Sequence, residues 1–195
     1  MKLERALFGV VLGGAAAMAA AQAPTTTSTQ VTTVRAAPPA GFRADYVAEA
    51  DSVGKKLVDL AQAIPADKYP WRPAPGVRSV SEVLVHVVQG NSMLPSLLGA
   101  ARMEGVSRES EKVVTDRQKI VELLKKSVEN ARAAGTRVAD ADLDKRIDFF
   151  GSPITQRALL IRILNHMHEH LGQLIAYARM NGIAPPWSEA GPPPK

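Results

Sequence analysis

Four stretches of the chain repeat apolar residues every three or four positions, the spacing that places side chains on one face of an α-helix. In the first stretch, residues 42–64, the apolar positions alternate steps of four and three: Tyr46, Ala50, Val53, Leu57, Leu60 and Ile64. In the third stretch, residues 116–134, the apolar positions are Ile120, Leu124, Val128 and Ala131. The second follows Ser79 and the fourth covers residues 155–180, and no stretch shows a convincing strand pattern. We therefore predict an all-α fold, a four-helix bundle in one domain.

Residues at the ends of these stretches support the predicted helices. Ser79 and Glu82 form a capping-box pattern at the start of the second helix. Thr115 and Thr155 are the expected N-caps of the third and fourth. Pro95 should kink or break the second helix, because it lacks an N–H and its ring clashes with the preceding turn.

The connections between the helices carry weaker signals. Trp71 lies in a proline-rich turn and should pack that turn against the bundle. Gly135 is expected to end the third helix. Residues 147–150 predict a short extended stretch that turns at Gly151. The long links on either side of the third helix leave room for crossover connections.

The N-terminal region has the pattern of a secretory signal peptide. A basic start at residues 1–5 precedes an uncharged apolar run at 6–20 and an Ala-x-Ala cleavage site at 21–23. The run is too short for a comfortable membrane span, although an uncleaved anchor is the alternative. We expect cleavage before Pro24, a flexible leader over 24–41, the bundle over 42–187, and a loose tail over 188–195. The mature protein should then have no membrane span and be periplasmic or secreted.

Composition excludes several functions. The formal net charge is +5, and loss of Lys2, Glu4 and Arg5 with the signal peptide lowers it by one. The charges are scattered and aromatic residues make up 5% of the chain, so no nucleic-acid partner is expected. Cysteine is absent, which excludes thiolate metal ligands and a cysteine nucleophile. Any metal site must use His, Asp or Glu.

Histidine is concentrated in the fourth predicted helix. His166 and His170 are four residues apart, so they share a helix face with Cβ atoms roughly 5–6 Å apart, a spacing that suits one metal ion. His168 points to the other side. His86, in the second helix, could complete the site across the bundle. The same spacing also occurs in histidine pairs on the surface or in the core, so spacing alone does not establish a metal site.

The neighbours of these histidines are informative. His166 and His170 lie on an otherwise apolar stripe, where unpartnered imidazoles would cost free energy that a metal or a hydrogen-bond network would offset. Glu82 lies one turn before His86 and could orient an imidazole. The HExxH zinc-protease motif is absent, because position 172 is glycine.

Several segments, in their order and spacing, resemble the DinB-like (YfiT-like) metal-binding four-helix bundles. Trp71–Pro73 with Ser79–His86 is similar to the family's entry into its second helix. Phe150–Thr155 is similar to the entry into the last helix, and His166–Arg179 with Gly182–Pro186 is similar to the H-x-x-x-H-x-G-Q segment and the exit that follows it.

The resemblance, which spans residues 44–187, implies up-down-down-up topology. It also implies a divalent metal, zinc or nickel, held by residues matching His86, His166 and His170. Relatives with known activity include thiol-dependent S-transferases and isomerases. Their low-molecular-weight thiols are cytoplasmic, so the signal peptide argues against that chemistry here.

We therefore expect a metal-dependent enzyme that hydrolyses an unidentified small molecule through metal-activated water. Glu82, Gln173 and Tyr177 are the candidate catalytic residues, and Met93 and Tyr177 are expected to line the pocket. A thiol-dependent S-transferase and a non-catalytic exported metal-binding or stress-associated protein are the alternatives. A homodimer is also left open.

Overall fold

The computed structural model describes residues 41–188. The predicted signal peptide and nearly all of the predicted leader and tail lie outside this range. The described residues form the helices α1 (Phe42–Ala63), α2 (Val80–Ser96), α3 (Ser110–Val113), α4 (Arg117–Arg137) and α5 (Gln156–Met180). They also form two short 3₁₀ helices, Ala66–Lys68 and Asp140–Asp142, and a hairpin of strands β1 (Arg146–Phe149) and β2 (Ser152–Thr155).

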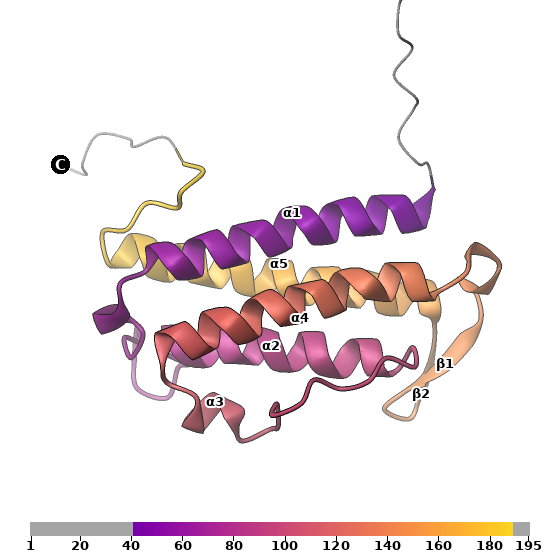
Figure 1. The fold of residues 1–195 in the computed structure, drawn as a ribbon, viewed down its shortest axis with the longest axis horizontal. Coiled ribbons are helices and arrows are strands. Elements are labelled where there is room, and N and C mark those ends of the chain that lie inside the picture. The colour runs from indigo at the N-terminus through magenta and orange to yellow at the C-terminus, as the bar shows by residue number, and fades with distance from the viewer. Residues whose placement is uncertain (1–40, 189–195) are drawn as a thin grey trace, which may run out of the picture. The chain divides into compact units, whose positions relative to one another are not determined.

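The four long helices form a bundle with up-down-down-up topology (Figure 1). Helices α1 and α5 run in one direction, and α2 and α4 run in the other. Helix α1 packs against α4 and α5, and α2 packs against the same two helices, so α1 and α2 are diagonal neighbours. The parallel pair α2 and α4 requires a connection that returns along the bundle, and α3 lies in it. The predicted fold class and topology are confirmed.

The predicted apolar stripe of α1 lies in the core. All six of its residues are at most 1% exposed. Burying such a side chain contributes roughly 1.5–3 kcal/mol, so the stripe is a major source of stability. Tyr46 satisfies its hydroxyl group in this apolar setting by donating a hydrogen bond of 2.6 Å to the carbonyl oxygen of Ala131 on α4.

Two helix ends differ from the sequence prediction. The N-cap of α4 is Asp116 and not Thr115, since the Asp116 carboxylate accepts a hydrogen bond from the Lys119 N–H at 2.7 Å. Helix α4 also continues through Gly135 to Arg137. A Cβ at Gly135 would lie 2.3 Å from the ring of Tyr46, so this glycine provides close packing against α1.

Pro95 does not break α2, which ends one residue beyond it. The missing proline N–H would leave the carbonyl oxygen of Asn91 without its helical partner. The side-chain amide of Asn130 on α4 donates to that oxygen at 2.7 Å. The proline is therefore tolerated in the last turn because a neighbouring helix supplies the lost hydrogen bond.

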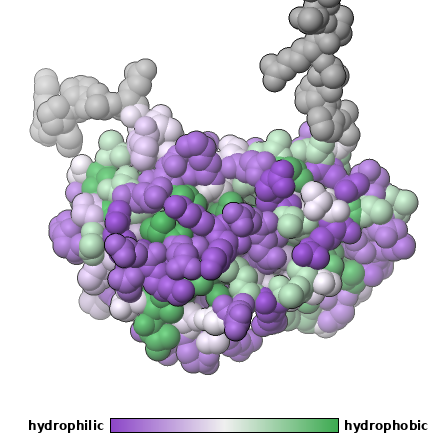
Figure 2. Space-filling model, viewed as in Figure 1, coloured by the Kyte–Doolittle hydropathy of each residue, from purple (hydrophilic) through white to green (hydrophobic). Residues whose placement is uncertain are grey.

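The extended stretch predicted before Gly151 is β1, and the sequence analysis missed its partner β2 and the short helix α3. The two strands are antiparallel, with Ile147 opposite Ile154. None of the helices within residues 41–188 combines the length and apolar character needed to cross a membrane. The face of the bundle seen in Figure 2 is largely hydrophilic, with scattered hydrophobic areas.

Candidate metal centre

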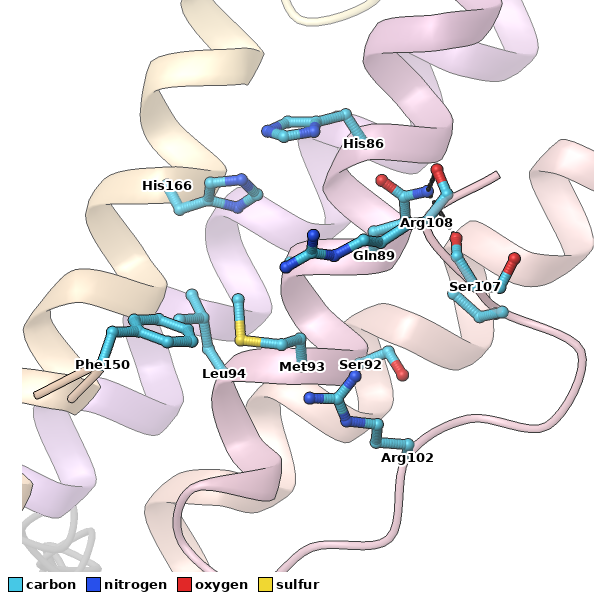
Figure 3. A pocket seen from close by; sticks show the side chains of 12 residues that line it. His86, Gln89, Ser92, Met93, Leu94, Arg102, Ser107, Arg108, Phe150 and His166 are labelled. Carbon is cyan, nitrogen blue, oxygen red and sulfur yellow. Dashed lines mark hydrogen bonds between the residues drawn. The ribbon is translucent and has the colours of Figure 1, made fainter. Parts of the chain in front are cut away.

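Helices α2 and α5 bring three imidazole rings together. His86 lies on α2, and His166 and His170 lie one turn apart on α5. Their ring centroids are 4.7–5.1 Å apart, and one nitrogen from each ring lies within 4.8 Å of the others. Figure 3 shows His86 and His166 facing each other from the two helices. The three histidines that the sequence analysis grouped therefore lie together in the structure.

The ring of His86 is held by a carboxylate from the α2–α4 connection. Its Nδ1 lies 2.7 Å from Oε1 of Glu111 on α3, and the other carboxylate oxygen accepts a 2.8 Å hydrogen bond from Arg78. Partial burial raises the pKa of Glu111, but the hydrogen bonds from Arg78 and His86 outweigh it and leave this pKa below its usual range. An ionised carboxylate only accepts, so Nδ1 of His86 carries a proton, and in the neutral tautomer of this ring the lone pair is on Nε2.

The ring of His170 is held by residues of its own helix. Its Nδ1 lies 2.9 Å from Oε1 of Gln173, and the amide of Gln173 donates to the Tyr177 hydroxyl at 2.9 Å. Trp71 packs edge-on against Tyr177 at 5.4 Å, which confirms that the proline-rich turn packs on the bundle. Because the amide oxygen only accepts, His170 also keeps its lone pair on Nε2.

The ring of His166 is held by packing. Its Nδ1 is buried and has no hydrogen-bond partner within residues 41–188. A Cβ at Gly90 on α2 would lie 2.2 Å from Cε1 of the ring, so the imidazole occupies the space that any other residue at position 90 would fill. Burial, aided by the nearby His170, His86 and Arg78, lowers the pKa of His166 to about 4. Burial also lowers the pKa of His170.

This arrangement fits a divalent cation. Metal ligation requires neutral imidazoles, and the lowered pKa values of His166 and His170 keep these rings neutral. The hydrogen bonds of His86 and His170 are the kind that fix the tautomer of a metal-ligating histidine. The unpartnered nitrogen of His166 is a cost that a cation in the cluster can help to offset. Nitrogens on a tetrahedral zinc are roughly 3.4 Å apart, so the rings would draw together slightly on binding.

A cavity of about 380 Å³ opens beside the cluster. His86 and His166 form part of its wall (Figure 3), and Met93 lines it as the sequence analysis expected. The rings of His86 and His166 therefore border the cavity, whereas His170 is buried behind them.

Comparison with known proteins identifies the family. A family model described as "DinB family" matches residues 38–191. The chain belongs to the DinB family. A curated DinB relative, the uncharacterized protein YjoA of Bacillus subtilis (strain 168), is 28% identical over 127 residues, which cover 64% of this chain and 80% of YjoA.

Solved DinB structures have the same fold. A DinB-like protein from Bacillus cereus ATCC 10987 aligns with a TM-score of 0.60 at 24% identity and covers 75% of this chain and 95% of its own. The crystal structure of YjoA from Bacillus subtilis aligns with a TM-score of 0.56 at 23% identity, covering 71% and 92%. These likenesses support the helical bundle.

One predicted role in this DinB protein is wrong. Glu82 does not orient an imidazole: its carboxylate accepts hydrogen bonds from the Ser79 N–H at 2.7 Å and from Arg72 at 3.3 Å. The first-turn glutamate closes the capping box, as its position in the helix dictates. Glu111 takes the role instead, and no helical periodicity in the sequence connects it with a histidine 25 residues away.

The other candidates in the DinB bundle lie where the sequence placed them or close by. Gln173 and Tyr177 are beside His170. Tyr177 does not line the cavity, contrary to the prediction, because its hydroxyl is turned to the Gln173 amide and its ring packs against Trp71. His168 lies outside the cluster, because its Nε2 is 2.8 Å from a carboxylate oxygen of Glu49 on α1. Gly90 was missed, and only its position one helical turn after His86 could have drawn attention to it.

Proposed function

We propose that this protein is a metal-dependent hydrolase whose ion, zinc or nickel, is held by His86, His166 and His170. The observation that carries the proposal is the convergence of these three rings, with potential ligand atoms within 4.8 Å of one another, beside a cavity that His86 and His166 line. Three protein ligands leave at least one coordination position open, which is typical of catalytic sites and not of closed structural ones.

The chain's own residues prepare the ligands. Glu111 holds the Nδ1 proton of His86, and Gln173 holds that of His170, so Nε2 of each ring is available to the ion. Tyr177 keeps the amide of Gln173 in the required orientation by accepting its N–H. Gln173 and Tyr177 are thus positioning residues in this proposal, acting through His170.

When bound, a divalent ion supplies Lewis acidity and lowers the pKa of water to about 7. In the proposed reaction, water adds its hydroxyl to the acyl carbon of an ester or amide, the bond to the leaving group breaks, and the leaving group takes the proton. Gly90 and the surrounding helices keep His166 desolvated and neutral, which maintains the third ligand.

The test begins with elemental analysis of protein purified without a chelating tag. The protein as purified is then assayed with ester, amide and phosphoester panels, and separately with a thiol plus an electrophile. We expect one divalent ion per chain and hydrolysis that is lost on chelation and in His86→Ala. Turnover only with added thiol would favour an S-transferase, and a bound ion without turnover would favour a non-catalytic metal-binding protein.

We also propose that the protein is exported after cleavage before Pro24. The support is the sequence pattern of residues 1–23. Intact-mass analysis of the exported fraction should give a chain that begins at Pro24, and a full-length mass there would contradict cleavage.

A further inference from the structure

The cavity beside the histidines has two arginines in its wall. Arg102 and Arg108 both line it, and both belong to the connection between α2 and α3. Within residues 41–188 neither guanidinium is paired with a carboxylate, whereas Arg72, Arg78 and Arg132 each are. None of the described residues that line the cavity is acidic. The wall therefore carries two guanidinium groups without a direct ion-pair partner among the described residues.

The backbone that carries these arginines is tied to α2. The side-chain amide of Gln89 donates to the carbonyl oxygens of Ser107 and Arg108, at 2.6 and 3.1 Å. The buried hydroxyl of Ser92 accepts from the Met103 N–H at 2.8 Å. Gln89 and Ser92 themselves line the cavity. Each arginine is thus attached next to a point where the connection is fixed to the helix that bears His86.

The arginine side chains face the open space. In Figure 3 the guanidinium of Arg108 extends into the middle of the cavity on the side of His166, and that of Arg102 lies at its lower edge. Guanidinium groups bind carboxylates and phosphates with paired N–H donors, and such charge-assisted hydrogen bonds are stronger than neutral ones.

Another part of the wall is apolar. Met93 and Leu94 of α2 and Phe150 of the hairpin form it. Phe150 is 65% exposed, an unusual state for a large aromatic residue. It has a positive φ of 52° at the hairpin turn, where the Asp148 carboxylate accepts a hydrogen bond from the Gly151 N–H at 3.1 Å. An apolar group in the cavity would cover this ring.

We propose that the cavity binds a small organic anion, with its carboxylate or phosphate on Arg102 and Arg108 and its apolar body against Met93, Leu94 and Phe150. Such a molecule lies next to His86 and His166. The inference that it is the substrate rests on the proposed hydrolytic function, which then acts on an ester or amide that carries a negative charge. Binding of the anion itself does not depend on turnover.

The direct test is calorimetric titration of the full chain with phenylbutyrate and with its neutral counterpart phenylbutanol. The titrations are run on the protein as purified and after chelation, so that coordination of the carboxylate to a metal is separated from pairing with the arginines. We expect the carboxylate to bind the chelated protein at least about tenfold more tightly than the alcohol. Equal affinities would overturn the proposal.

Matched variants assign the effect to the arginines. Arg102→Gln and Arg108→Gln should each reduce the preference for the carboxylate, and the double variant should bring it within about twofold of the alcohol. Arg132→Gln is the control, because it removes the same charge from an arginine that pairs with Asp51 and does not line the cavity. An unchanged preference in the double variant, or equal loss in the control, would contradict the assignment.

Two further ligands identify the anion and separate this inference from the proposed hydrolysis. The affinity of phenyl phosphate, set against that of phenylbutyrate, shows whether the cavity prefers a phosphate or a carboxylate. The difference in affinity between phenyl phosphate and inorganic phosphate measures the contribution of the apolar wall. This difference should be lost in Phe150→Ala. Binding of these anions, with no turnover of the ester and amide panels or of anionic esters and amides, would refute hydrolysis and leave this inference standing. Turnover of neutral esters with no preference for anionic ones would support hydrolysis and refute the inference that the substrate is an anion.

Discussion

Gly90→Ala should separate metal binding from folding. The added Cβ would lie 2.2 Å from Cε1, 2.6 Å from Nδ1 and 2.9 Å from Nε2 of the His166 ring. All three distances are too short for non-bonded atoms, so the ring has to leave its place. Because His166 makes no hydrogen bond within the described residues that would hold it, it should turn away from His86 and His170.

The expected cost to folding is small. Alanine is favoured over glycine inside a helix by about 1 kcal/mol. Crowding of a packed interior costs about 1–3 kcal/mol, and less where a side chain can rotate out of the way. The two contributions have opposite signs, so the free energy of unfolding of the metal-free protein should change by no more than about 1–2 kcal/mol.

The expected cost to metal binding is large. An ion at a hundredfold excess over its Kd stabilises the fold by about 2.7 kcal/mol, and a hundredfold weaker Kd leaves about 0.4 kcal/mol. For a domain of this size 1 kcal/mol corresponds to about 2–4 °C in Tm. Addition of the metal should therefore raise Tm by about 5–11 °C in the parent protein and by about 1–2 °C in Gly90→Ala.

Thermal melts with and without metal, together with elemental analysis, measure both effects. Gly172→Ala is the matched control, since it lies in the same helix as two of the ligands and a Cβ there meets nothing within 4 Å. The control should keep the metal and gain a little stability from helix propensity. If Gly90→Ala bound metal like the parent protein, either the packing of His166 or its role as a ligand would be wrong.

The remaining predictions concern the other groups of the site and one core residue. His170→Ala should lower the metal content at least tenfold, because loss of a ligand should cost at least as much as loss of a residue that hydrogen-bonds to a ligand. His168→Ala should leave the metal content unchanged. Equal losses of metal in the two variants, measured by elemental analysis, would mean that the wrong face of α5 had been chosen. Glu111→Gln should weaken metal binding about tenfold in a competition titration, because the ring it holds loses a charged partner, and an unaltered Kd would show that this carboxylate does not position its ring. Burial raises the pKa of Tyr69 to about 12, above the value of 10.0 for an unburied tyrosine. Since the folded state holds this proton more tightly than the unfolded state, the resulting stability is complete below pH 10 and is lost as pH rises toward 12. Denaturant unfolding over that range should therefore show a smaller decline in Tyr69→Phe, and an identical decline would refute the assignment.

The fold was largely predictable because the helices of this bundle carry clear periodic signals. The stripe of α1 repeats at helical spacing and every one of its residues is buried. Thr155 was correctly assigned as the N-cap of α5, where its hydroxyl accepts a hydrogen bond from the Ala158 N–H at 3.1 Å. The sequence predicted a kink or a break at Pro95, and the break does not occur because the compensating donor, Asn130, comes from another helix. Local rules describe the loss of a hydrogen bond but not its replacement by a distant residue.

The candidate site shows the same limit. The spacing of His166 and His170 predicted that they share a face, since both positions lie on one helix. The partner of His86 could not be found this way, because Glu111 reaches it from an irregular connection. Glu82 seemed suitable by helical position alone, yet the helix N-terminus already uses its carboxylate. Contacts between side chains on different elements depend on how those elements pack, and the periodicity of the sequence does not reveal that packing.

The proposed metal ligands and the proposed anion-binding arginines come from different parts of the molecule. Both ligand-bearing helices, α2 and α5, belong to the bundle, and their rings are positioned by core packing at Gly90 and by Gln173. The arginines and the glutamate on His86 come from the connection between α2 and α4. Loops tolerate sequence change more readily than buried helix faces do. Changes at Arg102 or Arg108 should thus alter which molecule binds without removing the metal, whereas a change at Glu111 affects the ion. In these proposals the connection therefore contributes both to the metal site and to the selection of the bound anion, and the helices supply the fixed frame for both.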